Sequence, residues 1–254
     1  METNFNAEQA RLWRDESRRE YHETQLSKPY RSTVHLARFM ARYLRRPRGE
    51  AIDVACGGAA NMVYLGRTFP GLSWTGVDIA SDELFGMAYR ALAAAGMKAT
   101  LIAGDFFELV KLVKGEKYDV VCSIQTLLAV PAWEQALAQL MAVTRGWLFV
   151  TSLFTDFDID ADIRVTDYTR PEGAQGPFPY NVYSAKRFAA RCAELGAKEV
   201  ASEDFEIDVD LPRAQQGVGT YTERLADGRR LQFSGPLHMP WKFFAIRVGE
   251  AAAV

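Results

Sequence analysis

One short stretch of small residues constrains this chain more than any other feature. Residues 53–61 read Asp-Val-Ala-Cys-Gly-Gly-Ala-Ala-Asn, and they lie between a strand predicted at 50–54 and a helix predicted at 61–68. A second predicted strand, 73–78, ends in Asp78. A strand, a tight turn of small residues, a helix and a strand ending in an acid together indicate a nucleotide site. The turn allows backbone N–H groups to approach a ligand closely, and the acid suits a ribose diol.

Alternating strands and helices continue over the next hundred residues. The apolar runs at 120–124 and 147–150 are typical of strands buried on both faces, so we expect a sheet that is parallel at its centre. The predicted strands are 50–54, 73–78, 99–103, 118–124 and 147–153, with helices at 61–68, 81–95, 105–113 and 132–144 between them. Beyond them we expect a helix at 185–195, a strand at 198–210, a hairpin at 221–233 and a final strand at 241–248.

Length, charge and cysteine content narrow the class of protein. A chain of 254 residues suits one α/β domain with additions, and a net charge of −2 provides no field that favours nucleic acid or an anionic membrane. Cys56, Cys122 and Cys192 are widely spaced, as expected of reduced thiols. The first residues lack the pattern of a signal peptide, and no apolar run reaches the ~18 residues of a spanning helix. We therefore expect a cytoplasmic protein with no nucleic-acid or membrane partner.

These segments resemble the class I S-adenosylmethionine-dependent methyltransferases of the small-molecule type. The first motif of that family is an acid followed by alternating small residues, E/D-x-G-x-G-x-G, and its positions fall on Asp53, Ala55, Gly57 and Ala59. Alanine therefore replaces glycine at the first and third glycine positions. Further segments match the ribose-binding acid, the adenine contact and the fourth-strand motif of the family: Asp78, Gly104-Asp105-Phe106 and 118–125. The resemblance covers residues 50–153 strongly and the rest of the chain loosely.

The resemblance implies an α/β fold with a Rossmann-like, seven-stranded, mostly parallel sheet. The last strand is expected to run antiparallel, with helices on both faces of the sheet and an N-terminal helical cap. A single methyltransferase domain would span 1–254. Its parts would be a helical cap (1–47), a cofactor-binding core (48–153), a lid insertion (154–183) and a C-terminal helix with strands and hairpin (184–254).

The implied cofactor is S-adenosyl-L-methionine, held where the predicted strands end. The residues expected to bind it are Tyr30, Asp53, Ala55, Cys56, Gly57, Gly58, Asn61, Asp78, Ile79, Asp105, Phe106, Ser123 and Gln125. Some of them have simpler interpretations. The two glycines also suit an ordinary turn, Asp105 suits the N-cap of the following helix, and Asp53 suits a turn-pinning role without ligand contact.

The implied reaction is methyl transfer to a small-molecule or saccharide-like acceptor, at oxygen rather than nitrogen. The residues expected to contact the acceptor are Leu127, Phe154, Tyr180, Tyr183 and Trp241. His238 and His22 are the candidate bases, because imidazole titrates near neutral pH, although each also suits a structural role. No metal site is expected, because Ser123 and Thr151 stand where metal-assisted relatives carry acids. The alternating acids at 156–162 suit a solvated lid edge better than a calcium loop.

Two other functions remain open from the sequence. One is a methyltransferase that acts on a protein or nucleic acid, for which a broad basic groove would be needed. The other is a non-catalytic S-adenosylmethionine-fold binding protein, for which degraded cofactor motifs would be expected. NAD is disfavoured as cofactor because the turn lacks the full G-x-G-x-x-G spacing. A homodimer is expected only from the general frequency of such assemblies.

Overall fold

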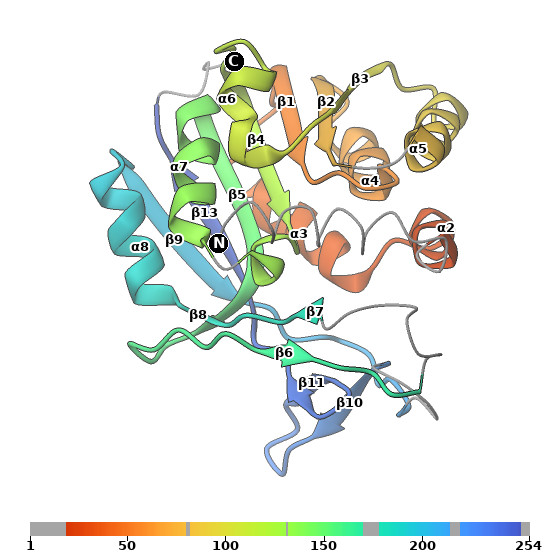
Figure 1. Cartoon of the computed structure of the whole chain (residues 1–254), viewed down its shortest axis with the longest axis vertical. Coiled ribbons are helices and arrows are strands. Elements are labelled where there is room, and N and C mark those ends of the chain that lie inside the picture. Colours follow the sequence, from red (N-terminus) through yellow and green to blue (C-terminus); the bar gives the residue numbers. More distant parts are fainter. Residues whose placement is uncertain (1–18, 80–81, 131, 170–177, 214–218, 250–254) are drawn as a thin grey trace.

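A mostly parallel sheet forms the centre of the molecule, with seven strands side by side and a short eighth strand, β8 (Tyr183–Ser184), paired with β5 (Thr144–Thr155) (Figure 1). The computed structural model describes residues 19–79, 82–130, 132–169, 178–213 and 219–249. The strand order is β3-β2-β1-β4-β5-β13-β9. These strands are β1 (Gly49–Val54), β2 (Leu72–Asp78), β3 (Ala99–Ala103), β4 (Tyr118–Ile124), β5 (Thr144–Thr155), β9 (Glu199–Asp204) and β13 (Trp241–Arg247). β13, the last strand of the chain, runs antiparallel to both β5 and β9, as the resemblance implied.

Helices cover both faces of this sheet, because successive strand residues point to opposite sides and both sides are apolar. Val120 packs in one hydrophobic cluster and Val121 in the other. The first cluster includes α3 (Arg31–Ala41), α4 (Ala60–Thr68) and α5 (Asp82–Ala94), and the second includes α6 (Leu109–Leu112), α7 (Trp133–Val143) and α8 (Ala185–Glu194). The predicted fold class is therefore confirmed.

Part of the N-terminal segment packs directly on the central sheet. α2 (Arg19–Ser27) lies next to α4, but α3 packs on the sheet itself, with the Phe39 ring 6.4 Å from that of Phe149 and 5.7 Å from that of Phe243. The part of the predicted cap before residue 19 lies outside the described residues, as does Ser81, the first residue of the helix predicted at 81–95.

Two predicted elements differ in length from those observed. The strand expected at 198–210 ends at Asp204, and the helix expected at 105–113 divides into a 3-10 turn, η2 (Phe106–Glu108), followed by α6. Asp105 caps the start of the 3-10 turn, because its Oδ1 accepts the Phe107 N–H at 2.9 Å. This cap holds the 3-10 turn close to the end of β3.

The segments outside the main sheet form small additions at one end of it (Figure 1). Within and after the predicted lid these are β6 (Arg164–Val165), β7 (Phe178–Pro179) and β8 (Tyr183–Ser184), which pairs with the end of β5. The expected hairpin is β10 (Thr220–Arg224) and β11 (Arg230–Ser234), extended by β12 (Leu237–His238). Together they lie beyond the carboxyl ends of the parallel strands, where open α/β sheets bind ligands. Residues 170–177 of the predicted lid lie outside the described part of the chain.

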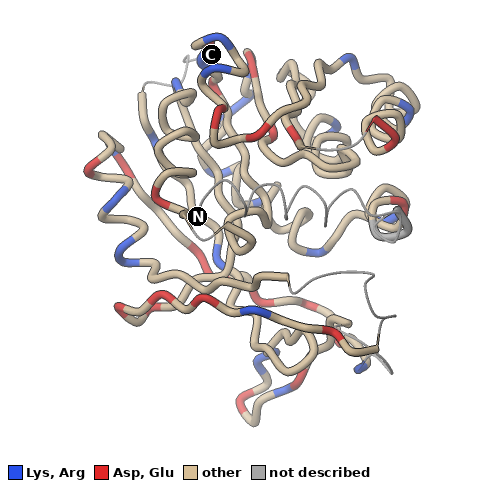
Figure 2. The backbone as a smooth tube through the Cα atoms, viewed as in Figure 1, with Lys and Arg blue, Asp and Glu red and all other residues tan. Residues whose placement is uncertain are grey.

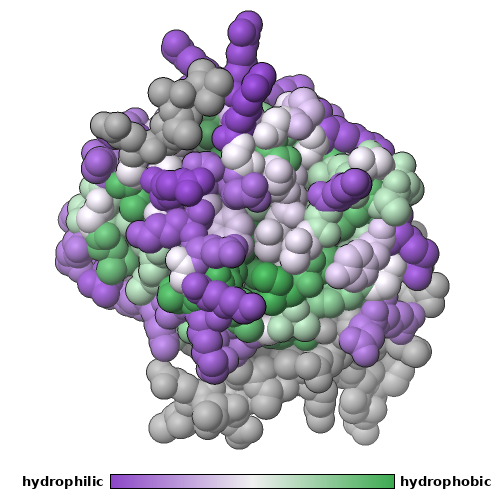
Figure 3. Space-filling model, turned by 90° about the horizontal axis from the view of Figure 1, so that it is seen from above, coloured by the Kyte–Doolittle hydropathy of each residue, from purple (hydrophilic) through white to green (hydrophobic). Residues whose placement is uncertain are grey.

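Charged residues of both signs are interspersed along the described backbone (Figure 2). The face seen in Figure 3 carries hydrophilic side chains both at its margin and across its middle, with hydrophobic ones gathered mainly in its lower half. No helix among the described residues is both long enough and apolar enough to cross a membrane.

Candidate functional site

The turn after β1 has an unusual backbone. Ala55, Gly57 and Ala59 have φ angles of 66°, 51° and 63°, all in the left-handed region. These are the three positions at which the family motif carries glycine, which adopts such angles without steric cost. Here alanine occupies two of them, and the turn keeps its shape because the Ala55 and Cys56 N–H groups both bond to the Val77 carbonyl, at 2.7 and 3.1 Å.

Asp53 in the first motif and Asp78 at the end of β2 occupy different environments. Asp78, at the end of β2, accepts the Gly57 N–H at 2.7 Å through Oδ2, and it lines a pocket above the turn. Asp53 is only 1% exposed and does not line that pocket. Neither of its carboxyl oxygens has a hydrogen-bond partner among the described residues. Burial, and secondarily the charge of Asp78, raises the pKa of Asp53 to about 8, so this carboxyl is protonated at neutral pH.

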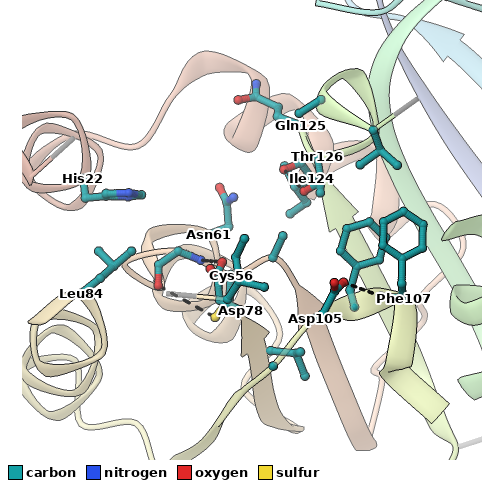
Figure 4. Close-up of a pocket in the computed structure, with 18 of the residues that line it drawn as sticks. His22, Cys56, Asn61, Asp78, Leu84, Asp105, Phe107, Ile124, Gln125 and Thr126 are labelled. Atoms are coloured by element: carbon teal, nitrogen blue, oxygen red, sulfur yellow. Dashed lines mark hydrogen bonds between the residues drawn. The ribbon is translucent and has the colours of Figure 1, made fainter. Parts of the chain in front are cut away.

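The first pocket brings together the carboxyl ends of four neighbouring strands and the helix α2 (Figure 4). The predicted cofactor residues that line it are Ala55, Cys56, Gly57, Asn61, Asp78, Ile79, Asp105, Phe106 and Gln125. Residues that sequence reasoning did not select also line it, among them Gln25, Leu84, Phe107, Thr126 and Ala129. Gly58 lies beneath α2 and is not part of the lining, Ser123 is buried in β4, and Tyr30 lines the neighbouring cavity.

His22 closes one end of the first pocket. It comes from α2, is 5% exposed, and packs directly on the glycine turn. A Cβ atom at Gly57 would lie 2.9 Å from His22 Cε1, and one at Gly58 would lie 3.3 Å from His22 Cβ. The turn therefore needs glycine at position 57 both for its backbone angle and for this close approach.

Gln125 stands between the first pocket and a second, larger cavity. It follows β4 with a φ of 59°, an uncommon angle for a residue other than glycine. Its N–H bonds to the Thr151 carbonyl at 2.8 Å, and its Nε2 donates to Ser32 Oγ at 3.0 Å. Both cavities include Gln125 and Ala129 in their walls, so the two cavities are next to each other.

The second cavity, of about 690 Å³, has mostly apolar and aromatic walls. They include Tyr30, Leu128, Phe178, Tyr180, Phe205, Met239 and Trp241. Lys28 and Arg31 also line it, and Arg31 forms an ion pair with Asp208. Two of the five residues predicted to contact an acceptor, Tyr180 and Trp241, are therefore found here.

The other three predicted acceptor residues are buried in the core and line neither of these two cavities. Leu127 and Phe154 are at most 2% exposed, and Phe154 packs against Phe188 and Phe244. The Tyr183 hydroxyl donates to the Leu127 carbonyl at 3.2 Å, which ties β8 to the segment after β4. These three side chains therefore belong to the hydrophobic core and do not line the site.

Neither candidate base lines the second cavity. His22 faces the first pocket, as described above. His238 lies in β12 and lines a third cavity together with Asp156, Arg229 and Lys242. Burial lowers the pKa of His238, so its imidazole is neutral at pH 7. Among the described residues, no three His, Cys, Asp or Glu side chains are grouped closely enough to hold a metal ion.

Comparisons with known proteins agree with this geometry. A family model described as a methyltransferase domain matches residues 51–146. An O-methyltransferase family protein from Burkholderia thailandensis superimposes with a TM-score of 0.58 at 11% identity, covering 92% of this chain and 60% of that one.

Two similar structures were solved with ligands bound. A 1,6-didemethyltoxoflavin-N1-methyltransferase from the same organism, with its substrate and S-adenosylhomocysteine, has a TM-score of 0.56 at 14% identity and covers 91% and 84% of the two chains. A magnesium protoporphyrin IX methyltransferase from Synechocystis with S-adenosylhomocysteine has a TM-score of 0.53 at 12% identity and covers 85% and 81%. A sequence search of the curated proteins found no match.

Proposed function

We propose that the chain is a class I S-adenosylmethionine-dependent methyltransferase, as the family model over residues 51–146 indicates, and that it methylates a small, largely apolar acceptor bound in the second cavity. One observation carries this proposal: the two cavities meet at Gln125 and Ala129. Methyl transfer is an in-line displacement, so the donor sulfur, the methyl carbon and the acceptor atom must align across such a junction.

The first pocket suits the cofactor part by part. Asp78 would bind the ribose hydroxyls, while Asp105 and the neighbouring Phe106 would hold the adenine ring. The turn from Ala55 to Gly58 would support the methionine part. When bound, the cofactor supplies a methyl group on a positively charged sulfur. The task of the protein is then to orient the acceptor and to exclude water, since little covalent chemistry is required of its side chains.

The second cavity suggests the kind of acceptor. Its aromatic walls favour a flat ligand. Its charged lining residues are Lys28, Arg31 and Asp210, and Arg31 is paired with Asp208, so these charges do not favour a ligand of either sign. No histidine lines this cavity in the described part of the chain. An acceptor oxygen that ionises without a protein base, as in a carboxylate or an acidic phenol, therefore fits better than an ordinary alcohol. The named substrates of two similar structures, magnesium protoporphyrin IX and 1,6-didemethyltoxoflavin, are small molecules too, although the likeness at that identity concerns the fold.

The first test is calorimetric binding of S-adenosylhomocysteine. We expect binding by the native protein and a loss of roughly 10-fold or more in Asp78→Ala, as for a lost charge-assisted hydrogen bond. Asp82→Ala, which removes an exposed acid of α5, is the matched control and should bind normally. No binding by the native protein at millimolar ligand would exclude the enzyme.

The second test is a methyl-transfer screen with labelled S-adenosylmethionine. Two classes of acceptor are supplied in pairs of similar shape: flat carboxylates with their amides, and acidic phenols with the corresponding benzyl alcohols. Heteroaromatic amines, saccharides, a basic peptide and an oligonucleotide are supplied singly. We expect label on the carboxylates or acidic phenols, lost in Trp241→Ala but kept in Tyr89→Ala on the outer surface. Faster labelling of the peptide or oligonucleotide would indicate a macromolecular acceptor. No labelling by a protein that binds the cofactor would favour the non-catalytic alternative.

A further inference from the structure

We propose that Asn181 and Tyr183 are positioning residues for the proposed reaction, because together they hold the segment 127–130, which lies in the walls of both cavities. The inference rests on the proposed function, since it assigns a supporting role to residues behind the same site. It gives Tyr183 a part in cofactor binding although its side chain lines neither cavity. Both residues lie beyond the stretch 51–146 that the family model matches.

The segment 127–130 contributes to both cavities within four residues. It contains the 3-10 turn η3 (Leu127–Ala129), which follows the end of β4. Val130 lines the first pocket, Leu128 lines the second cavity, and Ala129 lines both. A shift of this segment would therefore change the shape of both cavities at once. Methyl transfer is sensitive to such shifts, because a misplacement of about 1 Å can cost roughly 100-fold in rate.

The Tyr183 hydroxyl bonds to both ends of this segment. It shares its proton between the Leu127 carbonyl, at 3.2 Å, and the Val130 carbonyl. It also accepts a hydrogen bond from Asn181 Nδ2 at 3.0 Å, so its own proton is left for the two carbonyls. Burial raises the pKa of Tyr183, and the hydroxyl therefore remains a donor at neutral pH. Because Asn181 is 3% exposed and Tyr183 1%, water cannot easily replace these bonds.

Asn181 also connects this segment to a wall of the second cavity. Its N–H donates to the Leu128 carbonyl at 2.7 Å, and its Oδ1 accepts the Ile163 N–H at 3.2 Å. The preceding residue, Tyr180, lines the second cavity, and its N–H donates to the Ile163 carbonyl at 2.9 Å. Hydrogen bonds therefore run from the acceptor side of the site, through Asn181 and Tyr183, to the segment that borders the first pocket.

The test separates positioning from a general contribution to stability by removing one buried tyrosine hydroxyl at a time. Tyr183→Phe keeps the ring and removes only the hydroxyl that bonds to the segment. Tyr118→Phe is the matched control, because Tyr118 is 4% exposed, has Thr75 as the partner of its hydroxyl, and begins β4 at the end away from both cavities. Calorimetry measures S-adenosylhomocysteine binding, thermal unfolding measures stability, and amide hydrogen exchange measures local opening of the segment.

We expect Tyr183→Phe to weaken S-adenosylhomocysteine binding by roughly 3- to 10-fold, as for one buried hydrogen bond, and to speed exchange of the Ala129 and Val130 amide hydrogens. Asn181→Ala, which removes the partner of the Tyr183 hydroxyl, should weaken binding in the same direction. Tyr118→Phe should lower Tm by a similar amount and leave both the affinity and those two amides unchanged.

Unchanged affinity in Tyr183→Phe or in Asn181→Ala, or an equal loss of affinity in Tyr118→Phe, would overturn the inference. Each of these results would leave the proposed function intact, because the native protein would still bind S-adenosylhomocysteine. No binding by the native protein would reject the proposed function and the inference together.

Discussion

The buried carboxyl of Asp53 should make the stability of this protein depend on pH in a specific direction. Asp53 is 1% exposed, has no hydrogen-bond partner among the described residues, and has a pKa raised to about 8, chiefly by burial. In the unfolded chain its pKa returns to ~3.9. Between about pH 4 and pH 8 the folded state therefore keeps a proton that the unfolded state has lost. Because the folded state binds more protons, the free energy of unfolding falls as the pH rises through this window.

The expected size follows from the difference between the two pKa values. Each unit corresponds to about 1.4 kcal/mol, so at pH 7 the ionisation of Asp53 in the unfolded chain disfavours folding by about 4 kcal/mol. At pH 5 the same term is only about 1.5 kcal/mol. Asp53→Asn removes the ionisation and keeps the shape of the side chain. It should therefore stabilise the protein by roughly 3 kcal/mol more at pH 7 than at pH 5.

The assay is thermal unfolding of the native protein and of Asp53→Asn at pH 5, 6 and 7, followed by circular dichroism. For a chain of this length about 3 kcal/mol corresponds to roughly 6–12 °C in Tm. We expect the difference in Tm between variant and native protein to widen by that amount from pH 5 to pH 7. A difference that is the same at all three pH values would refute the reasoning, because Asp53 would then not be protonated in the folded state.

Asp119 provides a control, because its effect on the free energy of unfolding should depend on pH in the opposite direction from that of Asp53. The Arg145 guanidinium, which donates to its carboxylate at 2.8 and 2.6 Å, lowers the pKa of Asp119. This carboxylate therefore stabilises the fold at neutral pH, and its contribution is lost as the pH falls through the folded-state pKa, below about pH 4. Asp119→Asn should lower the free energy of unfolding by about 1–3 kcal/mol at pH 7. An increase in Tm at pH 7 would contradict this account.

Two further predictions concern the turn after β1. Ala55→Gly should raise stability by about 0.5–1 kcal/mol, because glycine relieves the left-handed backbone, whereas Ala91→Gly within α5 should lower it by about 1 kcal/mol; denaturant titration distinguishes the two signs. Gly57→Ala should lower both Tm and S-adenosylhomocysteine affinity, since its Cβ would collide with His22. Gly96→Ala, which has a similar φ of +67° but open space around it, should lower Tm alone. Unchanged cofactor affinity in Gly57→Ala would show that the turn and α2 do not support the ligand.

Much of the fold could be predicted because it depends on patterns that are local in the chain. The strands β1 to β4 begin and end within one residue of their predicted bounds, since apolar runs and the turns between them are set by nearby residues. The expected strand at 198–210 is shorter because only the residues beside β13 find a partner, and pairing of that kind is a long-range property. The pocket above the first turn could also be predicted, because the carboxyl ends of β1, β2 and β3 must lie at one edge of a parallel sheet.

The sequence by itself predicted the turn after β1 and a ligand site above it. It could do so because a strand, a turn, a helix and a second strand ending in an acid follow one another within thirty residues, and each restricts its neighbour. Only the tertiary structure decided which distant side chains complete the site. In the tertiary structure His22 packs on the glycine turn, and Tyr183 is buried with its hydroxyl bonded to the Leu127 carbonyl. His238 lines another cavity. Local patterns do not predict these placements, since they arise when elements tens of residues apart in the chain pack together and compete for the same apolar and polar surfaces. The walls of the second cavity come from such distant elements, which is why the sequence predicted a methyl donor and could not predict a specific acceptor.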